Sequence, residues 1–277
     1  MPHSIPDVRA GDVEIPVVGL GTWQLGDGEV QPLVEKALEL GYRHIDTALR
    51  YGNERGVGEG MRRSGIDRGE LFVTTKLDGP YQGDDRAIDG LEESLERLGF
   101  EYVDLLLMHW PLPARGQFVS TWHTFEKLYA DGRARAIGVS NFKGTHLEVL
   151  LAESDTVPAV NQVELNPYVT RTAQRAFDAE HGILTESWSP FGGSGARVLD
   201  ERVLAEVATR HGRTPGQVVL RWHVQVGLVV IPRSRNPQRM AENLEVFDFE
   251  LSADDLAAIA TLAHGPGAGV DSDRVGH

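Results

Sequence analysis

The stretch Tyr102-Val-Asp-Leu-Leu-Leu-Met-His109-Trp110-Pro111 decides the fold of this 277-residue chain. Its apolar run is short and almost continuous, which is typical of a strand buried on both faces of a parallel sheet. Pro111 cannot donate a hydrogen bond to a neighbouring strand, so strand pairing ends close to it. His109 is therefore expected where a buried strand meets a loop.

A histidine in this place has two interpretations. In a barrel of parallel strands, the carboxyl ends of the strands carry the chemistry. A single buried histidine is otherwise commonly a core residue whose ring is hydrogen-bonded to the backbone. The choice depends on whether other strands deliver polar residues to the same rim.

Strand and helix patterns alternate along the rest of the chain. Strands are predicted at 17–23, 44–47, 71–76, 102–109, 134–139, 159–163, 183–188 and 228–231. Helices are predicted at 29–40, 54–64, 84–98, 119–131, 145–153, 171–180, 198–211, 214–226, 237–244 and 253–262. Eight strand-helix units predict an α/β fold, a (β/α)8 TIM barrel with two extra helices, which typically needs about 250 residues.

Both ends of the chain are expected to lie outside the barrel, within one domain spanning 1–277. Residues 1–17 alternate around Gly11-Asp12 and predict a small N-terminal β-hairpin that acts as a lid. The tail 265–277 is Gly-rich and is expected to be mobile. A doubly wound sheet is the competing fold, but no G-x-G-x-x-G spacing follows the first strand.

Composition narrows the function classes. The net charge of −14 argues against a nucleic-acid or anionic-membrane surface. The absence of cysteine excludes disulfides and thiolate chemistry, and it fits a cytoplasmic protein. No apolar run approaches the ~20 residues of a membrane span. Only four of the 27 basic residues are lysine, so a lysine at a strand end is unlike the rest of the basic surface.

Asp46, Lys76 and His109 end the second, third and fourth predicted strands, and Tyr51 follows Asp46 by one short loop. Each has an ordinary interpretation alone, such as a helix cap for Asp46. Together on one rim they form a candidate proton-transfer site. Lys76 is expected to lower the pKa of Tyr51, Asp46 to pair with Lys76, and His109 to donate to a substrate oxygen. Such a group suits protonation of a carbonyl oxygen.

A set of motifs along nearly the whole chain resembles the aldo-keto reductase family in order and spacing. They are Gly19–Trp23, His44–Ala48, Tyr51–Glu54, Thr75-Lys76, Val103–Pro111, Ile137–Phe142, Asn161-Gln162, Trp188–Pro190 and Ile231–Ser234. Trp188 and the run Glu242–Phe249 are most similar to the bacterial 2,5-diketo-D-gluconate reductase branch.

The resemblance implies a barrel that binds NADPH or NADP+ without a Rossmann fold. It implies that Asp46, Tyr51, Lys76 and His109 are the catalytic tetrad, with Tyr51 as general acid and hydride passing from the nicotinamide to a carbonyl carbon. The implied cofactor contacts are Gly21, Thr22, Trp23, Ser140, Asn141, Gln162, Trp188, Ser189, Phe191, Gly193, Ile231, Arg233, Ser234, Arg239, Glu242 and Asn243.

Within that set, Ser140, Asn141 and Gln162 match the residues that hold the carboxamide, and Trp188 matches the ring that stacks on the nicotinamide. Ordinary core packing is the other interpretation of Trp188. Arg233, Ser234 and Arg239, with Arg235 nearby, suggest a 2′-phosphate site and a preference for NADPH over NADH. A solvated basic helix start is the alternative.

The substrate pocket is expected to be walled by Trp23 and Trp110 and to take a small carbonyl compound. If Arg50 points inward, it favours keto acids or keto sugars; if it points outward, it is uninformative. Short loops suggest an open site. A monomer is the family expectation.

Two rival functions stay open. One is an NADPH-binding redox-sensing or regulatory subunit without significant turnover. The other is a metal-dependent hydrolase, although no H-x-H pair or carboxylate cluster ends a predicted strand, so no metal ligands are assigned.

Overall fold

The computed structural model describes residues 5–193 and 195–277, so the first four residues of the predicted hairpin lie outside the described part. A sheet of eight parallel strands is ordered as the strands follow in the chain. They are β3 (Leu20–Gly21), β4 (His44–Asp46), β5 (Phe72–Leu77), β6 (Leu105–Met108), β7 (Ile137–Ser140), β8 (Val160–Glu164), β9 (Leu184–Trp188) and β10 (Val229–Val230).

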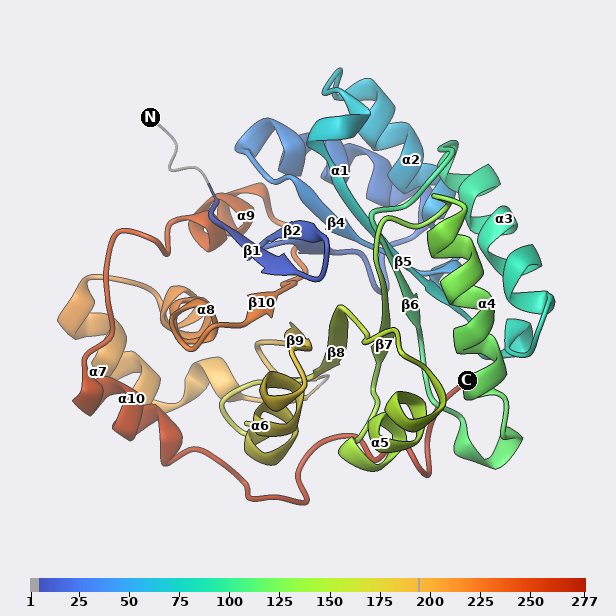
Figure 1. The fold of residues 1–277 in the computed structure, drawn as a ribbon. Helices are drawn as coiled ribbons and strands as arrows, with labels where there is room; N and C mark the ends of the chain where they lie inside the picture. Colours follow the sequence, from blue (N-terminus) through green and yellow to red (C-terminus); the bar gives the residue numbers. More distant parts are fainter. Residues whose placement is uncertain (1–4, 194) are drawn as a thin grey trace.

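The sheet closes between its first and last strands. Val18 pairs in parallel with Val230. The amide of Gly19 donates to the carbonyl of Val230 at 2.9 Å, and that of Gly21 donates to Pro232 at 3.1 Å. The predicted (β/α)8 barrel is therefore confirmed, with the strands inside a ring of helices (Figure 1).

Ten helices are found among the described residues. They are α1 (Asp27–Leu40), α2 (Glu54–Arg63), α3 (Arg86–Leu98), α4 (Phe118–Ala130), α5 (Gly144–Glu153), α6 (Thr172–Glu180), α7 (Arg202–His211), α8 (Pro215–Gln225), α9 (Pro237–Leu244) and α10 (Ala253–Ala260). β9 and β10 are each followed by two helices, which accounts for the two predicted extra helices. The helix predicted over 198–211 is interrupted, because Glu201 is extended and separates a 3₁₀ turn, Val198–Asp200, from α7. No helix in this part of the chain is long and apolar enough to cross a membrane.

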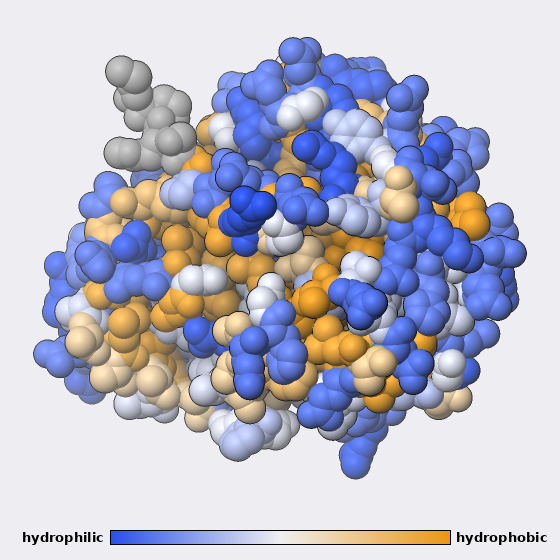
Figure 2. All heavy atoms as spheres, viewed as in Figure 1, coloured by the Kyte–Doolittle hydropathy of each residue, from blue (hydrophilic) through white to orange (hydrophobic). Residues whose placement is uncertain are grey.

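The N-terminal hairpin pairs β1 (Asp7–Ala10) with β2 (Val13–Pro16) around Gly11, whose φ is +58°. Its buried side chains Ala10, Val13 and Ile15 form one apolar cluster with residues at the amino ends of the barrel strands, such as Phe72 and Leu105. Apolar residues gather at the centre of this face, within a largely hydrophilic surround (Figure 2). The hairpin is thus a lid on the amino end of the barrel, opposite the rim that carries His109.

Helix α2 approaches its neighbours through glycines. A Cβ added at Gly56 would lie 2.1 Å from the carbonyl oxygen of Asp27 in α1, and one at Gly58 would lie 1.9 Å from that of Leu98 in α3. Glycine inside a helix costs about 1 kcal/mol relative to alanine. The close backbone contacts leave no room for the methyl group of alanine at either position. They fix α2, and α2 in turn follows directly on Tyr51.

We expect Gly58→Ala to lower the free energy of unfolding by about 1–3 kcal/mol, because the added methyl group overlaps a backbone carbonyl that cannot yield. Gly216→Ala in α8 is the matched control. Its Cβ would meet its nearest atom only at 3.8 Å, so it should be neutral or slightly stabilising. Denaturant unfolding of the two variants tests this, and equal stabilities would contradict it.

Candidate active site

A buried ion pair stands at the centre of the rim. Lys76, near the end of β5, donates from Nζ to Oδ1 of Asp46 at 2.6 Å and to the carbonyl of Thr47 at 2.9 Å. Its third contact is the hydroxyl of Tyr51 at 3.3 Å. Lys76 and Asp46 are almost completely buried. Burial alone would lower the pKa of Lys76, but the charge of Asp46 and the contact with Tyr51 outweigh it and raise that pKa. Lys76 therefore stays charged.

Tyr51 ends the 3₁₀ turn Leu49–Tyr51. The loop around this turn is held by Asn53, for which the sequence predicted no role. The fully buried Asn53 donates from Nδ2 to the carbonyls of Thr22 and Leu25, at 2.9 and 3.0 Å. Its Oδ1 accepts a hydrogen bond from the hydroxyl of Thr47 at 2.8 Å. Asn53 thereby ties the loops after β3 and β4 together. The Trp23 ring lies 4.8 Å from the Tyr51 ring.

The expected lowering of the Tyr51 pKa is wrong. Burial of the phenol raises the pKa of Tyr51 above its ordinary value of 10, and the negative charge of Asp46 raises it further. Lys76 acts in the predicted direction but is outweighed. Tyr51 therefore carries its proton at neutral pH, as a proton donor must.

His109 follows β6, and its ring lies 5.8 Å from that of Tyr51 in an edge-on arrangement. Burial, followed by the charge of Lys76, holds the pKa of His109 well below its ordinary value, so the imidazole is neutral. The side chain of Asn141 donates to the His109 carbonyl at 3.0 Å. The three residues predicted at strand ends and Tyr51, predicted in the loop after Asp46, therefore do meet at one place, and their catalytic roles remain predictions.

Beside them lies a cleft of about 770 Å³. It is lined by predicted site residues, namely Gly21, Trp23, Asp46, Tyr51, His109, Trp110, Ser140, Asn141, Gln162, Trp188, Ser189, Phe191, Gly193, Ile231 and Arg233. Of the five non-glycine residues with positive φ in the described chain, Gln24, Asn141 and Ser189 line it as well. Strained backbone of this kind concentrates at functional sites.

The residues predicted to hold a carboxamide are bonded to one another. Gln162 donates to Oδ2 of Asp46 at 2.8 Å, and the Ser140 hydroxyl donates to the Gln162 carbonyl at 2.9 Å. Asn141 donates to Oγ of Ser140 and accepts from Nε1 of Trp188, both at 3.0 Å. The network fixes the Trp188 ring at the wall of the cleft and links it to the ion pair.

Other predicted residues lie outside the cleft lining. The buried hydroxyl of Thr22 donates a hydrogen bond to the carbonyl of Asp46 at 2.9 Å. Ser234, Arg239, Glu242 and Asn243 belong to α9 and the turn before it. The Ser234 hydroxyl donates to the carbonyl of Asn236 and accepts from its amide. Glu242 accepts a hydrogen bond from Gln238, and Asn243 is buried.

The predicted arginine cluster is only partly available. Arg235 pairs with Glu29, with its Nε and an oxygen of that carboxylate 2.5 Å apart. Arg233 donates to the carbonyl of Trp23 and to Oε1 of Gln24 at 3.2 and 3.0 Å. Arg239 is exposed, and its guanidinium has no partner among residues 5–193 and 195–277. Arg50 does not line the cleft, and its guanidinium lies 3.3 Å from Asp78.

The C-terminal tail supplies residues that sequence reasoning missed. Val270, Val275, Gly276 and His277 line the cleft, so the site is more covered than the short loops suggested. No periodicity or motif in the glycine-rich tail indicates this placement. The partners that hold it lie more than a hundred positions earlier in the chain.

Glu186 was also missed. This β9 residue is completely buried inside the barrel, with Oε1 3.8 Å from Nε2 of His44. Neither of its oxygens accepts a hydrogen bond from a described residue. Burial, with a further contribution from Asp46, raises its pKa to about 8. A buried carboxyl group of this kind is protonated at neutral pH and adds no charge beside Lys76.

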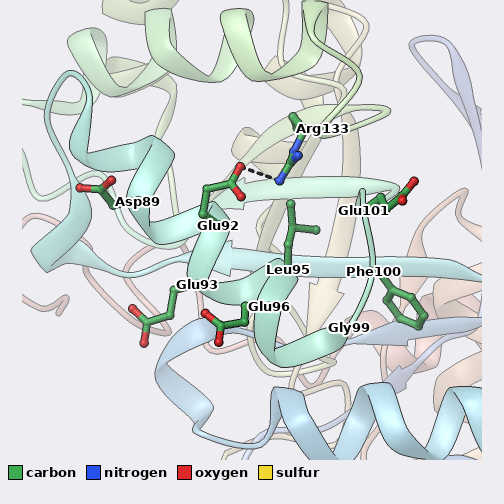
Figure 3. A pocket seen from close by; sticks show the side chains of 9 residues that line it. All are labelled: Asp89, Glu92, Glu93, Leu95, Glu96, Gly99, Phe100, Glu101 and Arg133. Carbon is green, nitrogen blue, oxygen red and sulfur yellow. Dashed lines mark hydrogen bonds and ion pairs between the residues drawn. The ribbon is translucent and has the colours of Figure 1, made fainter.

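A second hollow, of about 670 Å³, lies on the outside of α3 (Figure 3). It is lined by Asp89, Glu92, Glu93, Leu95, Glu96, Gly99, Phe100, Glu101 and Arg133. Glu92 pairs with Arg133, whereas Asp89 points away from the other side chains. This arrangement is a solvated acidic face without convergent groups.

The fold and the rim define the class of (β/α)8-barrel oxidoreductases that lack a Rossmann domain. A model of the aldo/keto reductase family matches residues 17–264. The chain therefore belongs to the aldo/keto reductase family, and the resemblance read from its motifs is confirmed.

Individual relatives agree along nearly the whole length. The chain is 45% identical over 264 residues to the methylglyoxal reductase DkgA of Escherichia coli (strain K12), covering 95% of this chain and 94% of that protein. It is 46% identical over 257 residues to an aldo-keto reductase of Mycobacterium sp. (strain KMS), covering 93% and 92%. The crystal structure of a Gox0644 mutant in complex with NADPH matches with a TM-score of 0.93 and 43% identity, covering 99% of this chain and 100% of that one.

Glu186 makes stability depend on pH in a defined direction. Its pKa is about 8 when folded and near the ordinary 4.5 when unfolded, so between these values only the folded state holds the proton. The contribution of Glu186 to the free energy of unfolding is therefore fully present below pH about 4.5, and it is lost as the pH rises toward 8. Because glutamine does not titrate, we expect the stability of Glu186→Gln relative to wild type to increase between pH 5 and 8.

Unfolding midpoints measured across that range test the prediction. Glu148→Gln, which changes an exposed carboxylate on α5, is the control and should show no such trend. If the difference in unfolding midpoint between Glu186→Gln and wild type stays constant with pH, the pKa of Glu186 does not differ between the folded and unfolded states, and the prediction is wrong.

Proposed function

We propose that this protein reduces small aldehydes and ketones to alcohols with NADPH, using Tyr51 as the general acid. The observation that carries the proposal is the buried chain from Asp46 through Lys76 to the Tyr51 hydroxyl, which ends beside His109 at a cleft. A proton-bearing phenol next to a fixed ammonium is suited to protonating a carbonyl oxygen.

The cleft residues fit a nicotinamide dinucleotide. Trp188 offers a flat wall fixed by Asn141, and Ser189 adopts a positive φ beside Phe191 and Gly193. Open space surrounds the position of a Cβ at Gly193, so backbone is accessible there to a phosphate group. Arg233 lines the same cleft and offers a fixed fork of donors. The bound dihydronicotinamide would supply the hydride.

The protein's own residues would handle the substrate oxygen. Tyr51 and His109 each donate a hydrogen bond to the carbonyl oxygen, and Tyr51 gives up its proton as negative charge develops there. The phenolate that remains is stabilised by Lys76, 3.3 Å away. Asp46 holds Lys76 in place and charged, and Gln162 orients Asp46. Burial of the pair strengthens these interactions because little water screens them.

The walls of the cleft support a class of substrate. Trp23 and Trp110 leave room for a small, partly apolar carbonyl compound. The relative DkgA of Escherichia coli is a methylglyoxal reductase, and a short ketoaldehyde such as methylglyoxal suits this pocket. Keto sugars and keto acids are further candidates. Arg50 is bound to Asp78, so an anionic substrate would have to draw it away. A cytoplasmic monomer without nucleic-acid or membrane partners remains the expectation.

Tyr51→Phe tests the role of Tyr51. We expect kcat to fall by about 10²- to 10⁴-fold, the usual contribution of a general acid, while NADPH still binds. NADPH oxidation with a panel of aldehydes, keto acids and keto sugars measures the first effect, and cofactor fluorescence measures the second. Tyr129→Phe is the matched control, because its hydroxyl contacts Asp12 at the surface.

The same panel separates the alternative function. Tight NADPH binding without turnover of any carbonyl by the wild-type protein would favour a redox-sensing or regulatory subunit. A Tyr51→Phe protein that retains nearly full turnover would contradict Tyr51 as the acid.

Arg239→Ala tests the preference for NADPH. If the free guanidinium binds the 2′-phosphate, its loss should weaken NADPH binding by about 10- to 100-fold and leave NADH binding unchanged, since charged hydrogen bonds contribute roughly 1.5–3 kcal/mol. Arg202→Ala in α7, where Arg202 pairs with Glu206, is the control. Equal NADPH constants in wild type and Arg239→Ala would contradict the assignment.

A further inference from the structure

We infer that Asp78, His109 and His277 form a binding site for a divalent transition metal at the mouth of the cleft. A metal bound there would occupy His109 and inhibit the enzyme. The inhibition rests on the proposed function, whereas the binding does not.

The three residues come from separate segments and converge. Asp78 follows β5, His109 follows β6, and His277 belongs to the C-terminal tail. One ligand atom from each lies within 4.8 Å of the others. The two imidazole rings are 4.8 Å apart and nearly perpendicular, at 79°. A carboxylate and two imidazoles thus share one small volume.

Both imidazoles have an unused ring nitrogen. Nδ1 of His109 and Nε2 of His277 are buried and have no hydrogen-bond partner among the described residues. His109 itself is only 6% exposed. An unsatisfied buried polar atom is costly, and a metal would remove that cost by accepting a lone pair. Asp78 already accepts the amide of Gly79 at 2.9 Å, which orients its carboxylate.

His277 is held where it is by its backbone. The amide of Gly79 donates to the His277 carbonyl at 3.2 Å. A Cβ at Gly79 would lie 2.4 Å from that oxygen, so this approach requires glycine. The residue after Asp78 therefore binds the tail directly, and the two prospective ligands are brought together by one contact.

The tail is also fastened upstream, where it runs past α6 and α5 (Figure 1). Asp273 accepts from Lys143 at 2.6 Å and contacts Nε2 of His146 at 2.8 Å. The amide of Val270 donates to Glu164 at 2.7 Å. These contacts anchor the segment that leads to His277, so its ring is delivered to His109 by a defined path.

The donor set matches a particular metal chemistry. Two imidazoles and one carboxylate, with a fourth position open to water, are typical of zinc in accessible sites. Bonds of about 2.0–2.2 Å in a tetrahedron put ligand atoms about 3.4 Å apart, so the widest pair would have to close by at most roughly 1.4 Å. Arg50 competes for Asp78 at 3.3 Å, but its side chain is 44% exposed and can turn into water.

Binding is tested with Co2+ as a spectroscopic probe on the untagged, full chain, followed by displacement with Zn2+. We expect one Co2+ per chain with the intense visible bands of low coordination. His277→Phe keeps the flat ring without a ligand atom, and Asp78→Asn removes the charge. Each should weaken binding by at least about 10-fold, since even outer-shell partners contribute that much. His264→Ala is the control, because its exposed ring stacks on Tyr168.

Arg50→Ala should act in the opposite direction and tighten binding, because it removes the competing cation. Zn2+ inhibition of carbonyl reduction, with each variant compared to its own metal-free rate, should follow the same order. The absence of the Co2+ bands, or equal affinity in wild type and His277→Phe, would overturn the site. Unchanged or weaker binding by Arg50→Ala would overturn the part assigned to Asp78. Metal binding by a protein without reductase activity would support the site and contradict the proposed function instead.

Discussion

The buried pair of Lys76 and Asp46 is the interaction on which the rest of the site depends. Removing two charges from water costs several kcal/mol each, and their attraction offsets this only when geometry and further hydrogen bonds are favourable. Here Lys76 has three contacts, and Asp46 accepts from Gln162 as well as from Lys76. Such an arrangement is an expensive way to stabilise a fold, since apolar packing would serve as well. Its presence at the carboxyl end of a barrel points to chemistry.

The other titratable groups buried near this ion pair are neutral. Glu186 is completely buried and is kept neutral by desolvation, so the net charge around Lys76 is set by Asp46. His44 is likewise buried, with its pKa lowered to about 4, and adds no charge. The polar groups around Lys76 are therefore neutral except for Asp46, and Lys76 of this ion pair contacts the hydroxyl of Tyr51.

Much of this could be predicted from the sequence because local patterns carry it. The apolar run before His109 and the lysine at the end of β5 place both residues by strand period alone. The net effect on the Tyr51 pKa could not be predicted, since it depends on desolvation that only the packed loops create. The burial of Glu186 could not be predicted, because a carboxylate in a strand pattern normally indicates an exposed position. The position of the C-terminal tail could not be predicted either, because its partners Lys143 and His146 are remote in sequence.

The seam that closes the barrel has a consequence for how the protein forms. β3 and β10 are two-residue strands more than two hundred positions apart, joined through a few backbone hydrogen bonds. Contacts with such separation carry the largest loop-closure cost, and strand pairing between distant segments is intrinsically slow. Gly21 and Ile231, on the two sides of this seam, both line the cleft. During synthesis the rim that carries Asp46, Lys76 and His109 can be assembled strand by strand, but the cleft has only one wall until the last strand has emerged.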